Sequence, residues 1–363
     1  MTLQPQSPQD VQEIVQTHSR LQPFAGRSKP ALSTLHPEAT PLDMSRLTGL
    51  LEYEPDEFTF TALAATPVAE VAAELAKHGQ YLPFDPLLVD RGATLGGTVA
   101  ANTAGSGRFR YGGVRDFILG VRFVDGQGQL VRGGGKVVKN AAGFDLPKFM
   151  VGSLGRYGLL TEITFKVFPR PRAYVTLQIT CARLETALQA TFKLANKPYE
   201  LDALDLRPRD NGQVQLLLRL GGPPEALSGR VARLRDFLAA EMAVLEASLA
   251  EGQADAALWA GINAVNWAKP GQALVKIPVA PKQLPALDGL PELGARHYSA
   301  AGNVAWVTVT NVPRLHQQLA EMGLAGLVLR GSAEQPLIGA RHGLPLAQRV
   351  KQALDPHGKF LEA

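Results

Sequence analysis

The sequence predicts an α+β protein of two domains, on three observations. The chain has 363 residues, more than one hydrophobic core usually organises. Short strand and helix patterns alternate up to residue 167, and the segment FPRPRAY (168–174) then interrupts them. Beyond it, alternating strands follow one another in pairs, which favours an antiparallel sheet over a doubly wound one. We therefore expect one domain over residues 1–172, a cap domain over 173–335, and a C-terminal helix and tail over 336–363.

The first domain opens with regular elements. Residues 58–65 read as a strand, and residues 67–79 as a helix with Val68, Val71 and Leu75 on one apolar face and Gly79 as its end. Residues 117–135 predict a hairpin turned at Asp125-Gly126. Strict alternation over 159–167 predicts a half-buried strand.

The second domain reads as strands with a few helices between them. The predicted strands are 174–180, 200–207, 213–220, 273–280, a paired segment near 296–310, and 325–331. The predicted helices are 183–195, a long Ala/Leu-rich one over about 224–250, 313–323, and a last one from 344 that stops at Asp355-Pro356.

Composition excludes several classes of protein. Hydrophobic residues make up 45% and charged residues 19%, as in ordinary folded proteins. The net charge of +4 is mild, and the Lys and Arg residues form no run, which argues against nucleic-acid binding. Cys181 is the only cysteine, so the chain has no internal disulfide, no CxxC pair and no iron–sulfur cluster of its own.

The sequence shows neither a secretory signal nor a membrane-spanning stretch. The N-terminus has no basic start followed by an apolar stretch, and no run of 18 apolar residues occurs. We expect a cytoplasmic protein that reaches a membrane only through a partner.

The stretch 91–113 holds seven glycines in 23 residues. Glycine permits positive φ and a close approach of the main chain to a ligand, and successive N–H groups in such turns form an anion site that suits a diphosphate. A glycine-rich surface loop is the alternative. The dinucleotide fingerprint GxGxxG with an acidic residue about 20 positions later is absent.

Several glycine-bearing segments recur in a fixed order: LPFDP (82–86), GATLGGTVAANTAG (92–105), the segment 112–135, KNAAGFDLPKFMVGSLGRYGLLTEITFKVFPRP (139–171), and LDPHGKF (354–360). Together they resemble the vanillyl-alcohol-oxidase (PCMH-type) superfamily of FAD-binding proteins. Within it they are most similar to the FAD-binding subunits of bacterial glycolate oxidases. The resemblance is strong over residues 50–171, weak over the N-terminus and architectural over 174–340.

This resemblance implies a PCMH-type domain of two subdomains with FAD between them, followed by an α+β cap domain. No histidine follows the first loop, so the resemblance implies non-covalent FAD. The residues it assigns to FAD are Gly26, Arg27, Ser28, Lys29, Pro83, Asp85, Gly92, Ala93, Thr94, Gly96, Gly97, Val99, Ala100, Asn102, Thr103, Ala104, Gly105, Arg115, Gly155, Gly158, Leu160 and Thr161. For Asp85, a turn former between two prolines is an equal alternative.

Two segments depart from the family pattern. The first pyrophosphate loop, GxGTS in the family, has only AGRSK (25–29) as its counterpart, where Arg27 and Lys29 would add cationic contacts. A loose N-terminal turn is the alternative. GSLG (152–155) replaces the family's GSEG, so the carboxylate there is missing.

The substrate side offers less. The related HxGDGNxH pattern has its nearest match in HYSAAGNVAW (297–306), where Ala305 stands in place of the last histidine and His297 has no second histidine to complete a metal pair. We therefore predict no metal site and name no catalytic residue. Arg115, Lys136 and Lys139 are candidates to lie near the isoalloxazine, with plain solvent exposure of the lysines as the alternative.

The leading hypothesis is an FAD-binding subunit of a glycolate oxidase complex, which oxidises glycolate to glyoxylate together with a catalytic flavoprotein and an iron–sulfur subunit. The first alternative is a self-sufficient FAD-dependent 2-hydroxyacid dehydrogenase. The second is a scaffold that has lost FAD.

Overall fold

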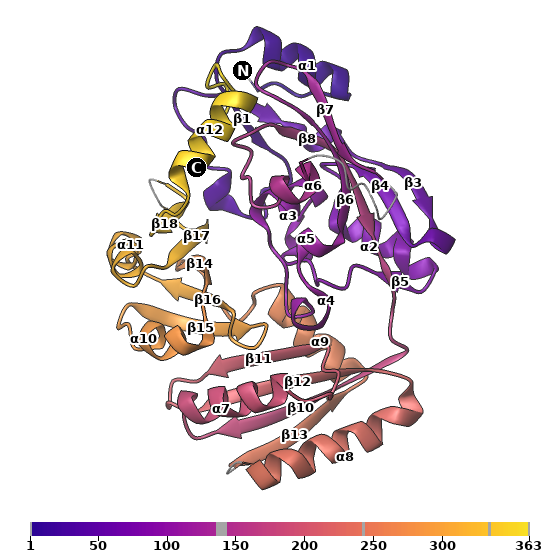
Figure 1. Cartoon of the computed structure of the whole chain (residues 1–363), viewed down its shortest axis with the longest axis vertical. Coiled ribbons are helices and arrows are strands. Elements are labelled where there is room, and N and C mark those ends of the chain that lie inside the picture. The colour runs from indigo at the N-terminus through magenta and orange to yellow at the C-terminus, as the bar shows by residue number, and fades with distance from the viewer. Residues whose placement is uncertain (1, 136–143, 242–243, 333–334, 362–363) are drawn as a thin grey trace. The chain divides into compact units, whose positions relative to one another are not determined.

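The computed structural model describes residues 2–135, 144–241, 244–332 and 335–361. The chain folds into two compact units (Figure 1). Unit 1 comprises Met1–Ala104, Gly112–Pro169 and Arg341–Ala363, and unit 2 comprises Gly105–Tyr111 and Arg170–Ala340. The domain bounds predicted at residues 172 and 335 stay a prediction.

Unit 1 is built around a five-stranded antiparallel sheet. Its strand order is β3 (Leu50–Glu54), β4 (Thr59–Leu63), β8 (Leu159–Lys166), β6 (Ile118–Val124) and β7 (Leu130–Gly134). Unit 1 also has two separate two-stranded sheets: parallel β1 (Leu21–Phe24) with β2 (Thr40–Asp43), and antiparallel β5 (Gln80–Tyr81) with β9 (Phe168–Pro169). Its helices are α1 (Pro8–Thr17), α2 (Val68–Lys77), α3 (Leu95–Ala101), α5 (Val114–Phe117), α6 (Leu146–Met150) and α12 (Leu344–Leu354).

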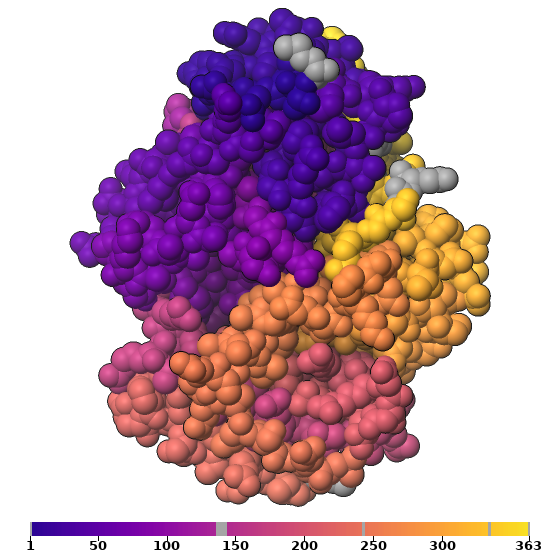
Figure 2. Space-filling model, turned by 180° about the vertical axis from the view of Figure 1, so that it is seen from behind, coloured from indigo at the N-terminus to yellow at the C-terminus, as the bar shows by residue number. Residues whose placement is uncertain are grey.

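The C-terminal segment completes the core of unit 1. Phe360 is buried in one cluster with Val11, Val15, Leu21 and Leu42. The Leu21 N–H donates to the Lys359 carbonyl at 2.8 Å, so the end of the chain extends the β1 pair. Figures 1 and 2 show the yellow C-terminal residues beside the indigo N-terminal ones.

Unit 2 is built around a nine-stranded antiparallel sheet. Its strand order is β13 (Glu246–Glu251), β10 (Ala173–Cys181), β12 (Val214–Gly222), β11 (Ala203–Pro208), β15 (Leu293–Ser299), β16 (Val304–Val309), β14 (Ala273–Pro278), β17 (Ala325–Arg330) and β18 (Leu337–Gly339). Its helices are α4 (Arg108–Tyr111), α7 (Leu184–Ala195), α8 (Pro224–Glu241), α9 (Gln253–Asn263), α10 (Leu284–Asp288) and α11 (Val312–Glu321). The antiparallel sheets agree with the predicted α+β class.

One face of this sheet is unusually polar for a buried surface. Thr176 on β10 accepts a hydrogen bond from the Trp259 ring at 2.7 Å and donates to Asp255 at 2.5 Å, which ties α9 to that face. The Arg219 guanidinium completes the network on Asp255 at 2.7 Å. Asp205 of β11 projects from the same face. It lies opposite Leu217 of β12, and Leu217 and Arg219, two residues apart in one strand, point to the same side of the sheet.

The long helix predicted over 224–250 is wrong in its second half. Helix α8 ends at Glu241, and Glu246–Glu251 forms the edge strand β13 paired with β10. The segment MAVLEASLAEG has helix-forming residues, but pairing with a buried central strand overrides that local propensity. Among the described residues, no helix is long and apolar enough to cross a membrane.

Candidate cofactor-binding site

The first predicted loop, residues 25–29, lies directly on the glycine-rich segment. It follows β1, and a Cβ built on Gly26 would stand 1.8 Å from the Gly92 carbonyl oxygen. Only glycine allows that main-chain approach. Arg27 adopts φ 47° and places its guanidinium 3.9 Å from the centre of the Phe24 ring. The two segments that the sequence ties to one ligand are therefore neighbours in space.

Lys29 brings a buried cation to this junction. The side chain is 6% exposed, and its Nζ donates to the Ser28 hydroxyl at 3.0 Å. A Cβ built on Gly97 would lie 3.7 Å from the same Nζ. Burial disfavours the charged form and lowers the pKa of Lys29 to about 8. An anion bound here would replace the lost solvation.

The glycine segment itself uses its main-chain N–H groups differently from our expectation. Gly92 donates to the Val89 carbonyl at 3.2 Å, Gly96 to the Ala64 carbonyl at 2.6 Å, and Gly97 to the Thr94 hydroxyl at 3.2 Å. A Cβ on Gly96 would also meet the Ala64 oxygen at 2.9 Å. These glycines let the backbone pack closely instead of leaving a row of vacant donors.

The vacant donors lie in the first loop. In the described part of the chain, the N–H groups of residues 26–29 donate to no protein group. Four successive main-chain donors beside a buried ammonium are what a diphosphate requires. Residues 25–29, the loop that matches the family pattern least well, thus supply the main-chain N–H groups that can donate to a ligand.

Three buried hydroxyls surround the end of α3. The oxygens of Thr98, Thr103 and Ser153 are buried and have no hydrogen-bond partner among the described residues. Ser153 is held there because Gly152 and Leu154 donate to the carbonyls of α3 at 2.9 and 3.0 Å. Thr98 and Ser153 were not among the predicted cofactor contacts. Their position inside a glycine-rich segment is the sequence feature that could have indicated them.

The turn 82–86 lies beside the end of the glycine segment. Pro86 forms an isolated bridge with Ala104, and Asp85 adopts φ 50°. Gly105 belongs to unit 2. Arg115 lies on α5 and is exposed.

In the last glycine segment, residues 155–161, one glycine lies beside β1, whereas Gly158 and Thr161 contact the five-stranded sheet. A Cβ on Gly155 would lie 3.5 Å from Pro23, which places that glycine at the end of β1. Gly158 packs on the Phe123 ring, and the Thr161 hydroxyl donates to the Arg122 carbonyl at 3.1 Å, so both serve the sheet. Lys136 and Lys139 fall outside the described residues.

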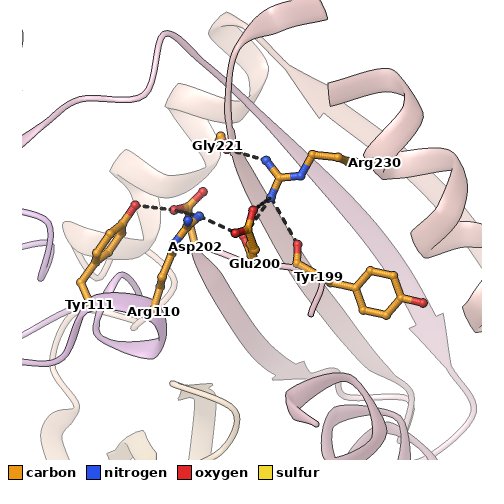
Figure 3. Close-up of polar contacts among 7 residues, drawn as sticks. All are labelled: Arg110, Tyr111, Tyr199, Glu200, Asp202, Gly221 and Arg230. Carbon is orange, nitrogen blue, oxygen red and sulfur yellow. Dashed lines mark hydrogen bonds and ion pairs between the residues drawn. The ribbon is translucent and has the colours of Figure 1, made fainter. Parts of the chain in front are cut away.

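In unit 2, two aspartates hold the short segment 105–111. The Tyr111 hydroxyl donates to Asp202 at 2.8 Å and Arg110 donates to the same oxygen at 3.1 Å (Figure 3). Ser106 donates to the buried Asp205. Arg230 braces the neighbouring main chain, with its guanidinium 2.7 Å from the Gly221 carbonyl (Figure 3).

The segment that matched HxGDGNxH forms a tight turn between β15 and β16. Ala300, Ala301 and Gly302 all have positive φ there. In the described ranges, no group of three His, Cys, Asp or Glu side chains is arranged to hold a metal ion.

Residues 1–134 match the family model described as an FAD binding domain. The chain is 47% identical over 137 residues to the glycolate oxidase subunit GlcE of Escherichia coli (strain K12), a match that covers 38% of this chain and 39% of that protein. It is 31% identical over 140 residues to the glycolate oxidase subunit GlcD of Bacillus subtilis (strain 168), covering 39% of this chain and 30% of that protein. These matches span well under half the length of the curated relatives.

A structural match covers nearly the whole chain. The fold resembles alkyldihydroxyacetonephosphate synthase with a TM-score of 0.70 and 16% sequence identity, over 98% of this chain and 75% of that one. Together with the family match, it confirms the fold class predicted from the sequence.

Proposed function

We propose that the chain is the FAD-carrying subunit of a glycolate oxidase complex, because its residues 1–134 match the family model described as an FAD binding domain. Such a complex oxidises glycolate to glyoxylate with a catalytic flavoprotein and an iron–sulfur subunit as partners. The likeness to two glycolate oxidase subunits supports the assignment.

The observation that carries the FAD site is the buried Lys29 ammonium, enclosed by the loop 26–29 and the glycine segment. The main-chain N–H groups of the loop and the Lys29 charge would hold the diphosphate. The hydroxyls of Thr98, Thr103 and Ser153 would donate to the remaining polar atoms of the cofactor. The other residues named from the resemblance remain proposed contacts.

FAD would supply the two-electron redox chemistry when it is bound. The residues of unit 1 would bind and orient the cofactor, and Gly26 packs closely on the Gly92 carbonyl beside the proposed phosphate position. Since Cys181 is buried and single, iron–sulfur clusters would belong to another subunit.

A self-sufficient FAD-dependent 2-hydroxyacid dehydrogenase is the second candidate. The similarity to a D-lactate dehydrogenase of Anaerostipes hadrus, 31% identical over 147 residues, favours it. It covers 40% of this chain and 30% of that protein, the same limited span as the glycolate oxidase matches.

The test is the flavin content and reactivity of the purified full-length chain. We expect a yellow protein whose flavin is released by acid, which demonstrates non-covalent FAD, and no bleaching when glycolate is added to the chain alone. Rapid bleaching by millimolar glycolate or lactate would establish the second candidate instead. A colourless protein that takes up no added FAD would leave only the scaffold reading.

The matched variants are Lys29→Met and Lys77→Met. Lys77 is an exposed lysine of the same unit, paired only with Glu74. We expect Lys29→Met to weaken FAD binding by about tenfold or more, as for the loss of one charge-assisted hydrogen bond, and Lys77→Met to leave it unchanged.

A further inference from the structure

The strand that leads into the proposed phosphate loop is held from two sides. β1 ends directly before the loop 25–29 and pairs with β2 on one side. On the other side, Leu21 bridges Phe360 in parallel, and its N–H donates to the Lys359 carbonyl at 2.8 Å. The position of the loop therefore depends on where the C-terminal segment, residues 355–361, lies.

The buried carboxylate of Asp355 shapes this C-terminal segment. The residue is 2% exposed, its Oδ1 accepts the Lys359 N–H at 2.8 Å, and its Oδ2 accepts the Phe360 N–H at 2.9 Å. A Cβ built on Gly126 would stand 2.2 Å from Asp355 Oδ1, so the turn of the β6–β7 hairpin packs directly on this carboxylate. A carboxylate buried in this way is stabilised by a cation beside it.

The Lys351 ammonium of α12 is that cation. Its Nζ donates to Asp355 Oδ2 at 2.7 Å, to the Phe360 carbonyl at 2.7 Å and to the Arg156 carbonyl at 2.8 Å. The side chain is 13% exposed. An ammonium has three N–H donors, and each of them has an acceptor here. Lys351 can therefore act on a ligand only through the segments that it joins.

The segment around Arg156 belongs to the proposed FAD site. Ser153, three residues earlier, has a buried hydroxyl without a partner among the described residues. A Cβ built on Gly155 would lie 3.5 Å from Pro23 of β1. Through the Arg156 carbonyl, Lys351 thus fixes this segment relative to the same C-terminal residues that hold β1.

We infer that Lys351 is a positioning residue of the FAD site: it holds the loop 25–29 and the segment 152–158 at the separation that the cofactor requires. The inference rests on the proposed function, because it concerns the same site. Donors on two separate segments serve one ligand only when each is placed to within about 0.5 Å. Without the ammonium, two carbonyl groups and one buried carboxylate lose a donor, and the segments are free to move apart.

The experiment compares FAD affinity with stability in the full-length chain. Fluorescence titration with FAD measures the dissociation constant, and urea unfolding followed by circular dichroism measures the stability. We expect Lys351→Met to weaken FAD binding by about tenfold or more. Lys351→Arg, which keeps the charge and the donors, should bind FAD within about threefold of the parent chain.

The control is Leu75→Ala, which removes a buried side chain of α2 in the same unit and takes part in none of these contacts. It should lower the urea midpoint with little change in FAD affinity. Equal FAD affinity in Lys351→Met and the parent chain would overturn the inference. So would losses of affinity in Lys351→Met and Leu75→Ala that follow stability alone.

Hydrogen exchange of the FAD-free chain gives a second readout. Peptides that cover residues 21–29 and 152–158 should exchange faster in Lys351→Met and change much less in Leu75→Ala. If Lys351→Met fails to fold, Lys351→Gln, whose amide keeps two N–H donors, should still weaken FAD by about threefold or more. A parent chain that binds no FAD contradicts the proposed function, and the exchange rates then still decide whether Lys351 fixes the two segments.

Discussion

His297 Nε2 lies 2.7 Å from Asp205 Oδ2, although 92 residues separate them in the chain. The same oxygen accepts the Ser106 hydroxyl, and Oδ1 accepts the Ala300 N–H at 3.1 Å. One fully buried carboxylate therefore joins the segment 105–111, β11 and the turn after β15. We expect the stability of this part of unit 2 to depend on this carboxylate.

Asp205→Asn is expected to lower the free energy of unfolding by about 2–4 kcal/mol. The three donors use both carboxylate oxygens, whereas the amide has only one oxygen that accepts and an NH2 group that donates. Denaturant unfolding followed by circular dichroism measures the change. The control is Asp210→Asn in the exposed β11–β12 turn, which should change the stability by less than about 0.5 kcal/mol. Equal stabilities of the two variants would contradict the role given to Asp205.

The affinity for FAD should depend on pH through Lys29. Its pKa in the protein without cofactor is lowered to about 8 by burial, and a bound diphosphate favours the charged form. The affinity should therefore be highest below pH 8 and fall above it, by up to about tenfold per pH unit. Fluorescence titration with FAD between pH 6.5 and 9.5 measures this. Lys29→Met should bind weakly with a flat profile, and a falling profile in that variant would assign the effect to another group.

Lys276 predicts a pH dependence of stability. Its folded pKa is lowered from 10.5 to about 7, so between those values the unfolded chain binds the proton and the folded chain does not. Stability due to this group is thus lowest below pH 7 and rises from pH 7 to about pH 10. Lys276→Met should be more stable than the parent by several kcal/mol, on the order expected for such a shift, at pH 6 and by much less at pH 10. Urea unfolding of both proteins at pH 6 and pH 10 measures the difference in their free energies of unfolding. A difference that is no smaller at pH 10 than at pH 6 would contradict the prediction.

Gly26→Ala should disrupt the cofactor site. A Cβ there meets the Gly92 oxygen at 1.8 Å, and that oxygen belongs to packed main chain, so the loop must move. We expect a loss of about 2 kcal/mol or more in stability together with loss of bound FAD. Gly135→Ala, where a Cβ meets nothing within 4 Å, is the matched control. Retained FAD in Gly26→Ala would show that the loop is not part of the site.

Two ion pairs of unit 2 should differ sharply in their effect. Arg219 pairs with Asp255 at 2.7 Å, and their side chains are 12% and 2% exposed. Arg219→Met leaves a buried carboxylate without its cation and should cost about 3–5 kcal/mol. Arg172→Met breaks an exposed pair with Glu225 and should cost less than about 1 kcal/mol. Thermal unfolding of both variants compares them, and a similar loss in both would contradict this ranking.

The sequence predicted most of the fold because its signals are local. The hairpin at Asp125-Gly126 and the alternation before Val167 appear as β6, β7 and β8. The strand Glu246–Glu251 was missed since its pairing with β10 is non-local and its residues favour a helix. Pairing with a strand far away in the chain cannot be recognised from a short stretch of sequence.

The candidate site was only partly predictable. The glycine spacing indicated that two segments approach closely, but it could not show that Gly92, Gly96 and Gly97 use their own N–H groups within the protein. Lys276 was overlooked, although a single lysine in the apolar run ALVKIPVA is a signal in itself.

The position of Phe360 in the core beside Leu21 sets the order in which the molecule can be completed during synthesis. Leu21 is translated before residues 170–340, whereas Phe360 and the Lys359 carbonyl, which accepts the Leu21 N–H, are translated after them. The hydrophobic core of unit 1 therefore stays incomplete in the nascent chain until residue 360 has been translated.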